Sequence, residues 1–115
     1  MTTRQARGRL AEQRACVYLE AQGLRLLERN YRCRAGEIDL IMRDGEALVF
    51  VEVRLRTNPG FGGALMSVDR FKRARLIACA QHYLQTSQSS CAARFDIITI
   101  DAGERLDWVR NAFDA

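Results

Sequence analysis

The sequence predicts an α/β fold, a mixed β-sheet flanked by helices, in one domain over residues 1–115. Two segments repeat apolar residues at helical spacing, and five shorter segments have the apolar alternation or density of strands. Together they give the order αβββαββ. Because the second helix lies between two strands of one expected sheet, it is predicted to act as a crossover. A chain of 115 residues is long enough for one modest core.

The first helix is predicted over residues 4–22, where Gly23 would end it. Glu12 borders its core-facing stripe instead of standing opposite to it. The stripe is formed by Ala11, Ala15, Tyr18 and Gln22, with Leu19 alongside. A first strand is expected over residues 24–32.

A β-hairpin is predicted over residues 37–42 and 47–54, because Asp44-Gly45 stands between two apolar runs. In the second strand, side-chain alternation places Glu52 and Arg54 on the face of Leu48 and Phe50, with valines on the other face. Burying a carboxylate unpaired among such residues costs free energy. A metal or an arginine is therefore expected beside Glu52.

Residues 57–63 contain three glycines and the only proline, which predicts a loop. A second helix is expected over residues 68–85. Its predicted buried stripe is Phe71, Ala74, Ile77, Ala78 and Leu84. Strands over residues 94–101 and 106–112 complete the sheet.

The composition excludes several classes of protein. No apolar run is long enough to cross a bilayer, and the N-terminus lacks the apolar segment of a signal peptide, so no membrane partner is expected. Four scattered cysteines without a CxxC pair argue against a zinc site, and His82 is expected to be an ordinary helix residue. Free thiols predict a reduced, cytoplasmic protein.

Positive charge is concentrated at the N-terminus, where residues 1–34 have a balance of +5 within a net charge of +4. A second basic cluster follows at the start of the second helix. Such clusters suit a polyanion such as nucleic acid, although arginines can also simply solvate helix faces. The candidate contacts are Arg4, Arg7, Arg70, Lys72, Arg73 and Arg75.

The hairpin sets Asp39 and Glu52 on neighbouring strands, an arrangement that suits a divalent ion. Carboxylate oxygens are the ligands that Mg²⁺ prefers, and the main-chain carbonyl of Val53 is a further candidate. The alternative is a structural ion pair between Glu52 and an arginine. Glu37 is expected on the same strand face as Asp39. It would either line the same pocket or pair with Arg32 or Arg34.

Several blocks of the sequence carry a resemblance to one family. The most specific are Gly36-Glu37-Ile38-Asp39-Leu40-Ile41 and Val49-Phe50-Val51-Glu52-Val53 at their present separation. On these blocks the chain resembles the YraN family (uncharacterised protein family 0102), of the restriction-endonuclease-like PD-(D/E)XK superfamily. The resemblance extends over nearly the whole chain and implies a restriction-endonuclease-like core.

The resemblance implies metal-binding acids at Asp39 and Glu52 for Mg²⁺ or Mn²⁺, and a catalytic lysine at position 54. This chain has Arg54 there, and arginine cannot act as a base, so Arg54 is expected to position water or phosphate. Lys72 is the only lysine. It is an alternative source of that amine, although a solvated helix residue is the preferred interpretation. Glu12 matches a helix glutamate that assists the metal in junction-resolving relatives.

The leading hypothesis is a DNA-binding protein of nuclease fold that cuts branched or structured DNA with Mg²⁺ or Mn²⁺, with Asp39, Glu52 and Arg54 as catalytic residues. A homodimer would present two such sites to a branch. The alternative is a catalytically inactive DNA-binding or protein-interaction module on the same fold. Asp96 and Arg94 match family positions, but a structural pairing between strands accounts for them.

Overall fold

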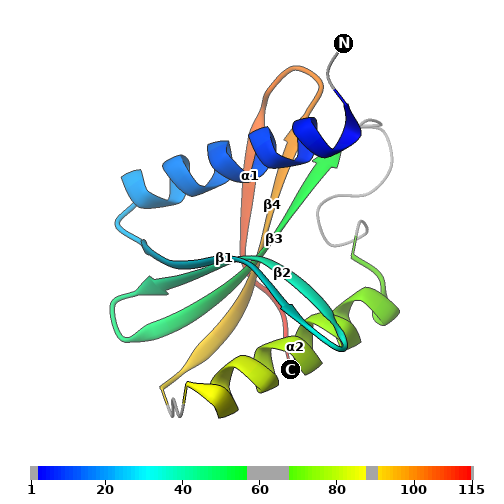
Figure 1. Cartoon of the computed structure of the whole chain (residues 1–115). Coiled ribbons are helices and arrows are strands. Elements are labelled where there is room, and N and C mark those ends of the chain that lie inside the picture. The colour runs from blue at the N-terminus through cyan, green and yellow to red at the C-terminus, as the bar shows by residue number, and fades with distance from the viewer. Residues whose placement is uncertain (1–2, 57–67, 88–90, 115) are drawn as a thin grey trace.

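The computed structural model describes residues 3–56, 68–87 and 91–114 (Figure 1). The element order is αβββαββ, as predicted. The elements are α1 (Arg4–Ala21), β1 (Arg25–Cys33), β2 (Gly36–Asp44), β3 (Ala47–Arg56), α2 (Arg70–Thr86), β4 (Ala93–Asp101) and β5 (Leu106–Phe113). The predicted loop at residues 57–63 and the side chain of Arg4 lie outside the described part.

The five strands form one mixed sheet in the order β1-β2-β3-β4-β5. Neighbouring strands are antiparallel except for β3 and β4, which are parallel. A parallel pair needs a crossover connection, and α2 provides it between these two strands. The predicted mixed sheet with a crossover helix is therefore confirmed.

The β2–β3 hairpin turns at Gly45 and Glu46, directly after Asp44, where the sequence predicts a hairpin. Gly45 has φ +62°, in the left-handed region that glycine adopts without a steric penalty. The Cα partners Asp44 and Ala47 close the ladder at the turn. Both strands extend beyond the predicted boundaries, since β2 begins at Gly36 and β3 ends at Arg56.

Helix α1 begins at the N-cap Thr3, whose hydroxyl accepts a hydrogen bond from the Ala6 N–H. It ends before Gly23, which has φ +100° and permits the chain to turn into β1. The buried residues of the helix are Ala11, Ala15, Cys16 and Leu19. Gln22 is exposed and caps the C-terminus, so its predicted place in the core stripe is wrong.

Helix α2 begins at the N-cap Asp69, which accepts the Lys72 N–H at 2.8 Å. Its buried residues are Leu76, Cys79 and Ala80. The predicted stripe is therefore wrong: Phe71 is 72% exposed, Ala74 and Ala78 are also exposed, and only Ile77 and Leu84 pack partly against the core. Alanines are distributed around this helix, so apolar spacing alone permits more than one stripe.

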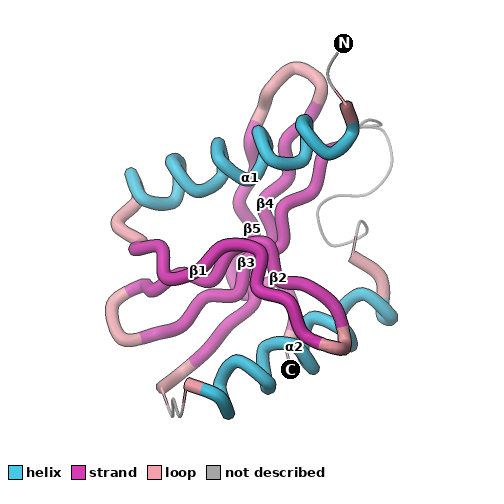
Figure 2. Tube along the Cα trace, viewed as in Figure 1, coloured by secondary structure: helices cyan, strands magenta, loops and turns pink. Residues whose placement is uncertain are grey.

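The two helices cover opposite faces of the sheet (Figures 1 and 2). Alternation along β3 divides its apolar residues between these faces, as predicted. Val49 and Val51 belong to the core beneath α1, and Leu48 and Phe50 to the core against α2. All four side chains are at most 2% exposed, so β3 is buried on both faces.

The β1–β2 hairpin twists part-way along its length, so that its side chains change to the opposite face of the sheet. Ile38 packs in the α2 core whereas Leu40 packs in the α1 core, although alternation would place both on one face. Asn30 of β1, which lies between the register pairs Arg29–Leu40 and Tyr31–Ile38, has φ +50°. This conformation is uncommon for a non-glycine residue, and asparagine is among those that adopt it. The twist therefore falls at Asp39.

Neither helix in the described part combines the length and apolar character needed to cross a membrane. None of the four cysteines, all of which lie in the described ranges, forms a disulfide bond.

Candidate functional site

Strand β2 leaves β3 at Asp39. The last Cα pair between the two strands is Leu40–Val51, so the next backbone groups of β3 lack partners from β2. The Asp39 carboxylate takes one of these places, because its Oδ2 accepts the Val53 N–H at 2.8 Å. This bond satisfies a β3 donor that β2 leaves unpaired, beside a gap between the two strands.

The gap opens as a cleft of about 320 Å³. It brings together the two predicted metal-binding acids and two further predicted site residues, Glu12 and Arg54. The lining residues are Gly8, Ala11, Glu12, Asp39, Glu52, Val53, Arg54 and Leu55. Helix α1 supplies one wall, and the ends of the β2–β3 pairing supply the other.

Glu52 is only 4% exposed. Lys72 Nζ lies 3.5 Å from its Oε1, which pairs β3 with the first turn of α2. The other carboxylate oxygen, Oε2, is buried without a hydrogen-bond partner. Because a buried polar atom left unsatisfied costs about 1–3 kcal/mol, a cation at this oxygen would stabilise the site.

Burial raises the pKa of both acids. Burial, followed by the negative charge of Glu52, raises the pKa of Asp39 to about 8, although the hydrogen bond from Val53 opposes the shift. Burial also raises the pKa of Glu52, against the opposing charges of Lys72 and Arg54. Perturbed carboxylates in a cleft are a common feature of functional sites.

Glu12 reaches this cleft from α1, and its charge adds to the rise in the pKa of Asp39. Its Oε1 accepts a hydrogen bond of 3.0 Å from Asn30 Nδ2. This asparagine therefore holds the glutamate at the rim.

The preferred prediction for Lys72, a solvated helix residue, is wrong, because Lys72 is paired with Glu52. The signal for this contact was present in the sequence. Lys72 precedes Leu76 by four residues and therefore shares a helix face with it. Identifying Leu76 as the core residue would have placed Lys72 towards the sheet.

Glu37 lies outside the cleft. The same Asn30 Nδ2 donates to it at 3.0 Å, and Arg32 Nε lies 3.7 Å from its Oε2. It lines a neighbouring cavity of about 520 Å³ with Gln5, Gly8, Arg9, Glu12, Asn30 and Arg32. The β1–β2 hairpin twists at Asp39, and this twist explains why Glu37 and Asp39 line different cavities.

No group of three or more His, Cys, Asp or Glu side chains in the described ranges is positioned to hold a metal ion. A magnesium ion usually retains several waters and takes one or two protein carboxylates together with substrate phosphate. The donor set of Asp39 and Glu52, with an unsatisfied buried oxygen, fits an ion bound in that manner.

The predicted nucleic-acid contacts divide between two elements on opposite sheet faces. Arg7 is exposed on α1, and Arg70 and Arg75 are exposed on α2. Arg73 has a structural role, because its Nε donates to the Val68 carbonyl and its guanidinium lies 5.5 Å from the centroid of the Phe113 ring. In Figure 1 the N-terminal turns of both helices lie on the side where β3 ends.

Arg94 and Asp96 form a structural network, as expected. Asp96 is 1% exposed and accepts hydrogen bonds from Arg94, Trp108 Nε1 and the Asn111 N–H. His82 is an exposed residue of α2 that hydrogen-bonds to the Tyr31 hydroxyl, which agrees with the expectation of an ordinary helix residue.

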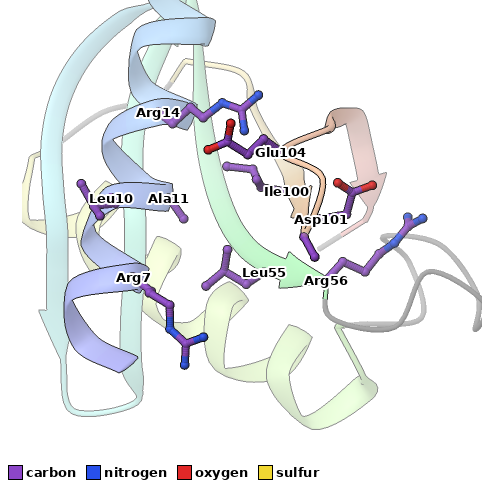
Figure 3. Close-up of a pocket in the computed structure, with 10 residues that line it drawn as sticks. Arg7, Leu10, Ala11, Arg14, Leu55, Arg56, Ile100, Asp101 and Glu104 are labelled. Atoms are coloured by element: carbon purple, nitrogen blue, oxygen red, sulfur yellow. The ribbon is translucent and has the colours of Figure 1, made fainter. Parts of the chain in front are cut away.

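A further cavity, of about 280 Å³, adjoins the cleft and shares Ala11 and Leu55 with it (Figure 3). Its residues Leu10, Arg14 and Arg56 are not among the site residues predicted from the sequence. Apolar residues at the start of α1 and the end of β3 were visible in the sequence, but their meeting depends on how α1 crosses the sheet.

Comparison with known proteins places the chain in a family. The model of Uncharacterised protein family UPF0102 matches residues 11–100. The chain belongs to this family. The UPF0102 match covers Glu12, Asp39, Glu52, Arg54 and Lys72.

Curated relatives match over nearly the whole chain. A UPF0102 protein of Alkalilimnicola ehrlichii is 56% identical over 112 residues, covering 94% of this chain and 86% of the relative. A UPF0102 protein of Dechloromonas aromatica is 55% identical, covering 98% of this chain and 92% of the relative. A third, from Methylococcus capsulatus, is 52% identical over 94% of this chain and 90% of the relative.

Proposed function

We propose that this UPF0102 member is a nucleic-acid-binding protein of nuclease fold that cleaves phosphodiester bonds in structured DNA with Mg²⁺ or Mn²⁺. The observation that carries the proposal is the unpartnered, buried Oε2 of Glu52 beside Asp39 in an open cleft. The restriction-endonuclease-like core implied by the family resemblance supports the same activity.

Asp39 and Glu52 would hold the divalent ion. When bound, the ion would orient the scissile phosphate, acidify a water ligand and stabilise developing charge. The Val53 N–H fixes one Asp39 oxygen at 2.8 Å, which presets the direction of the carboxylate. Glu12, at the rim, would accept hydrogen bonds from waters around the ion.

Lys72 and Arg54 would act on the substrate. Arginine stays charged at all working pH values, so Arg54 can hold a phosphate oxygen or a water but cannot remove a proton. Lys72 has an amine that can change its protonation state, and it already lies 3.5 Å from Glu52. We therefore assign the role of the motif lysine to Lys72 and a phosphate-holding role to Arg54.

Exposed positive charge on the two helices would bind the nucleic-acid backbone. Arg7 on α1 and Arg70 and Arg75 on α2 are exposed and available for phosphate contacts, which give affinity without sequence readout. The N-terminal end of α1 adds a partial positive charge, because its N-cap is the neutral Thr3 and its first turn has no acidic residue. A homodimer would place two such clefts on one branched DNA.

The test is cleavage of labelled branched, flapped and single-stranded DNA with Mn²⁺. We expect the wild type to cut and Asp39→Ala and Glu52→Ala to lose activity by at least about 100-fold. Glu46→Ala, which removes an exposed turn carboxylate, is the matched control and should cut normally. Lys72→Ala should lose activity while Arg54→Lys retains it.

Wild-type protein that binds DNA but leaves every substrate intact would contradict the enzymatic proposal. Cutting that survives in both Asp39→Ala and Glu52→Ala would contradict the assigned site.

The second candidate is an inactive DNA-binding or protein-interaction module, and the Lys72–Glu52 pair favours it. A lysine at 3.5 Å could neutralise Glu52 permanently and take the place of the ion. In that case Mn²⁺ would not stabilise the wild type but would stabilise Lys72→Met, in which the positive charge is gone. Arg70→Met, on the same turn of α2 but exposed, is the matched control.

A further inference from the structure

The cavity beside the cleft has an apolar floor. Its carbon surface comes from three elements and the turn after β4: Leu10, Ala11, Leu55, Ile100 and Ala102. Leu10 is 65% exposed and Leu55 is 46% exposed. Single exposed leucines are ordinary on a protein surface, but these two meet in one cavity, which is typical of a ligand site.

Three arginines surround this floor. Arg7 and Arg14 project from α1 and Arg56 from the end of β3 (Figure 3). The Nε of Arg56 is buried and has no hydrogen-bond partner, so it retains an unused donor. Donors of this kind match the oxygens of a phosphate.

Two acids also line the cavity, Asp101 and Glu104. Asp101 is committed to the β4–β5 turn, because its Oδ1 accepts the Arg105 N–H at 2.8 Å and its carbonyl accepts the Glu104 N–H. Three guanidinium groups against two carboxylates leave the wall net positive. An apolar floor within a net positive wall is complementary to a nucleotide, which joins a flat apolar base to an anionic phosphate.

We infer that this cavity holds the base of an unpaired nucleotide, next to the phosphodiester that lies in the cleft. The inference rests on the proposed function and narrows its substrate. The cavity and the cleft share Ala11 and Leu55, so consecutive units of one strand can occupy both. A volume of about 280 Å³ lies just below the roughly 300–1,000 Å³ of ordinary ligand sites and suits one base.

This assignment favours single strands, flaps and frayed ends over continuous duplex. A base within a duplex must leave its stack to enter such a cavity, which costs a few kcal/mol, whereas an unpaired base enters without that cost. The base rests between Leu10 and Leu55, and the arginines contact the flanking phosphates.

The experiment measures binding by fluorescence anisotropy in EDTA, so that it does not depend on cleavage. The probes are a short labelled single-stranded DNA and a strand of equal length made of abasic nucleotides, which keeps the phosphates and removes the bases. We expect the wild type to bind the intact strand about tenfold more tightly. Leu10→Ser should reduce this preference towards unity with little change in affinity for the abasic strand.

Val17→Ser is the matched control, because Val17 is 54% exposed on the same helix and does not line the cavity. It should retain the full preference for the intact strand. Equal binding of both strands by the wild type, or an undiminished preference in Leu10→Ser, would overturn the inference while leaving nucleic-acid binding intact. Failure to bind either strand at low salt would overturn the nucleic-acid function and the inference with it.

Discussion

Glu52 of β3 and Asp96 of β4 are both buried acids on neighbouring strands, but their surroundings differ. Asp96 accepts hydrogen bonds from Arg94, Trp108 and Asn111, so the chain itself satisfies the carboxylate. Glu52 has one lysine at 3.5 Å and a second oxygen without a partner. Asp96, whose carboxylate is hydrogen-bonded within the fold, is a structural residue. Glu52, which has an oxygen without a partner, is available to bind a cation.

The largest expected effect is a loss of stability when Asp96 is replaced. Asp96→Ala should lower the free energy of unfolding by about 3–5 kcal/mol, because it leaves Arg94 and the Trp108 N–H without their buried partner. Urea denaturation measures this change. Asp107→Ala, at a partly exposed acid of β5, is the control and should change stability by less than about 0.5 kcal/mol. A loss of stability below about 1 kcal/mol in Asp96→Ala would contradict the structural role that distinguishes Asp96 from Glu52.

The next largest expected effect is the stabilisation of the protein by a metal ion at Glu52. Mn²⁺ at 100 times its dissociation constant should stabilise the wild type by about 2.7 kcal/mol, because the ion binds only the folded protein. Thermal unfolding with and without the ion measures this gain. Glu52→Gln should lose it, while Glu46→Ala should keep it. Equal stabilisation of Glu52→Gln would mean that the ion binds elsewhere.

The smallest expected effect, counted per pH unit, is a pH dependence in EDTA. Asp39 has a pKa raised from 3.8 to about 8 by folding, so between these values the folded state holds a proton that the unfolded state has lost. Stability should therefore fall as pH rises from about 4 to about 8, by up to about 1.4 kcal/mol per pH unit for one proton. Asp39→Asn should flatten this slope in urea titrations. A wild-type slope of the opposite sign would contradict the buried, protonated state.

Much of the fold was readable from the sequence. Asp44-Gly45 fixed the hairpin turn, Gly23 ended α1, and alternation along β3 divided Val49 and Val51 from Leu48 and Phe50. These features depend on local conformational preference and on the two-residue period of a strand, which short segments specify by themselves. The predicted hairpin put Asp39 and Glu52 on neighbouring strands.

The tertiary structure alone decided how the site is completed. The face of α2 that packs on the sheet depends on which residues fill the space above it, so spacing could not choose Leu76 over Phe71, and Lys72 was misplaced with it. The departure of β2 from β3 at Asp39 is likewise non-local, because it requires the turned-over hairpin at Asn30. The sequence by itself determined the elements and the two acids. Packing between distant segments decided the cleft, its lysine and the cavity beside it.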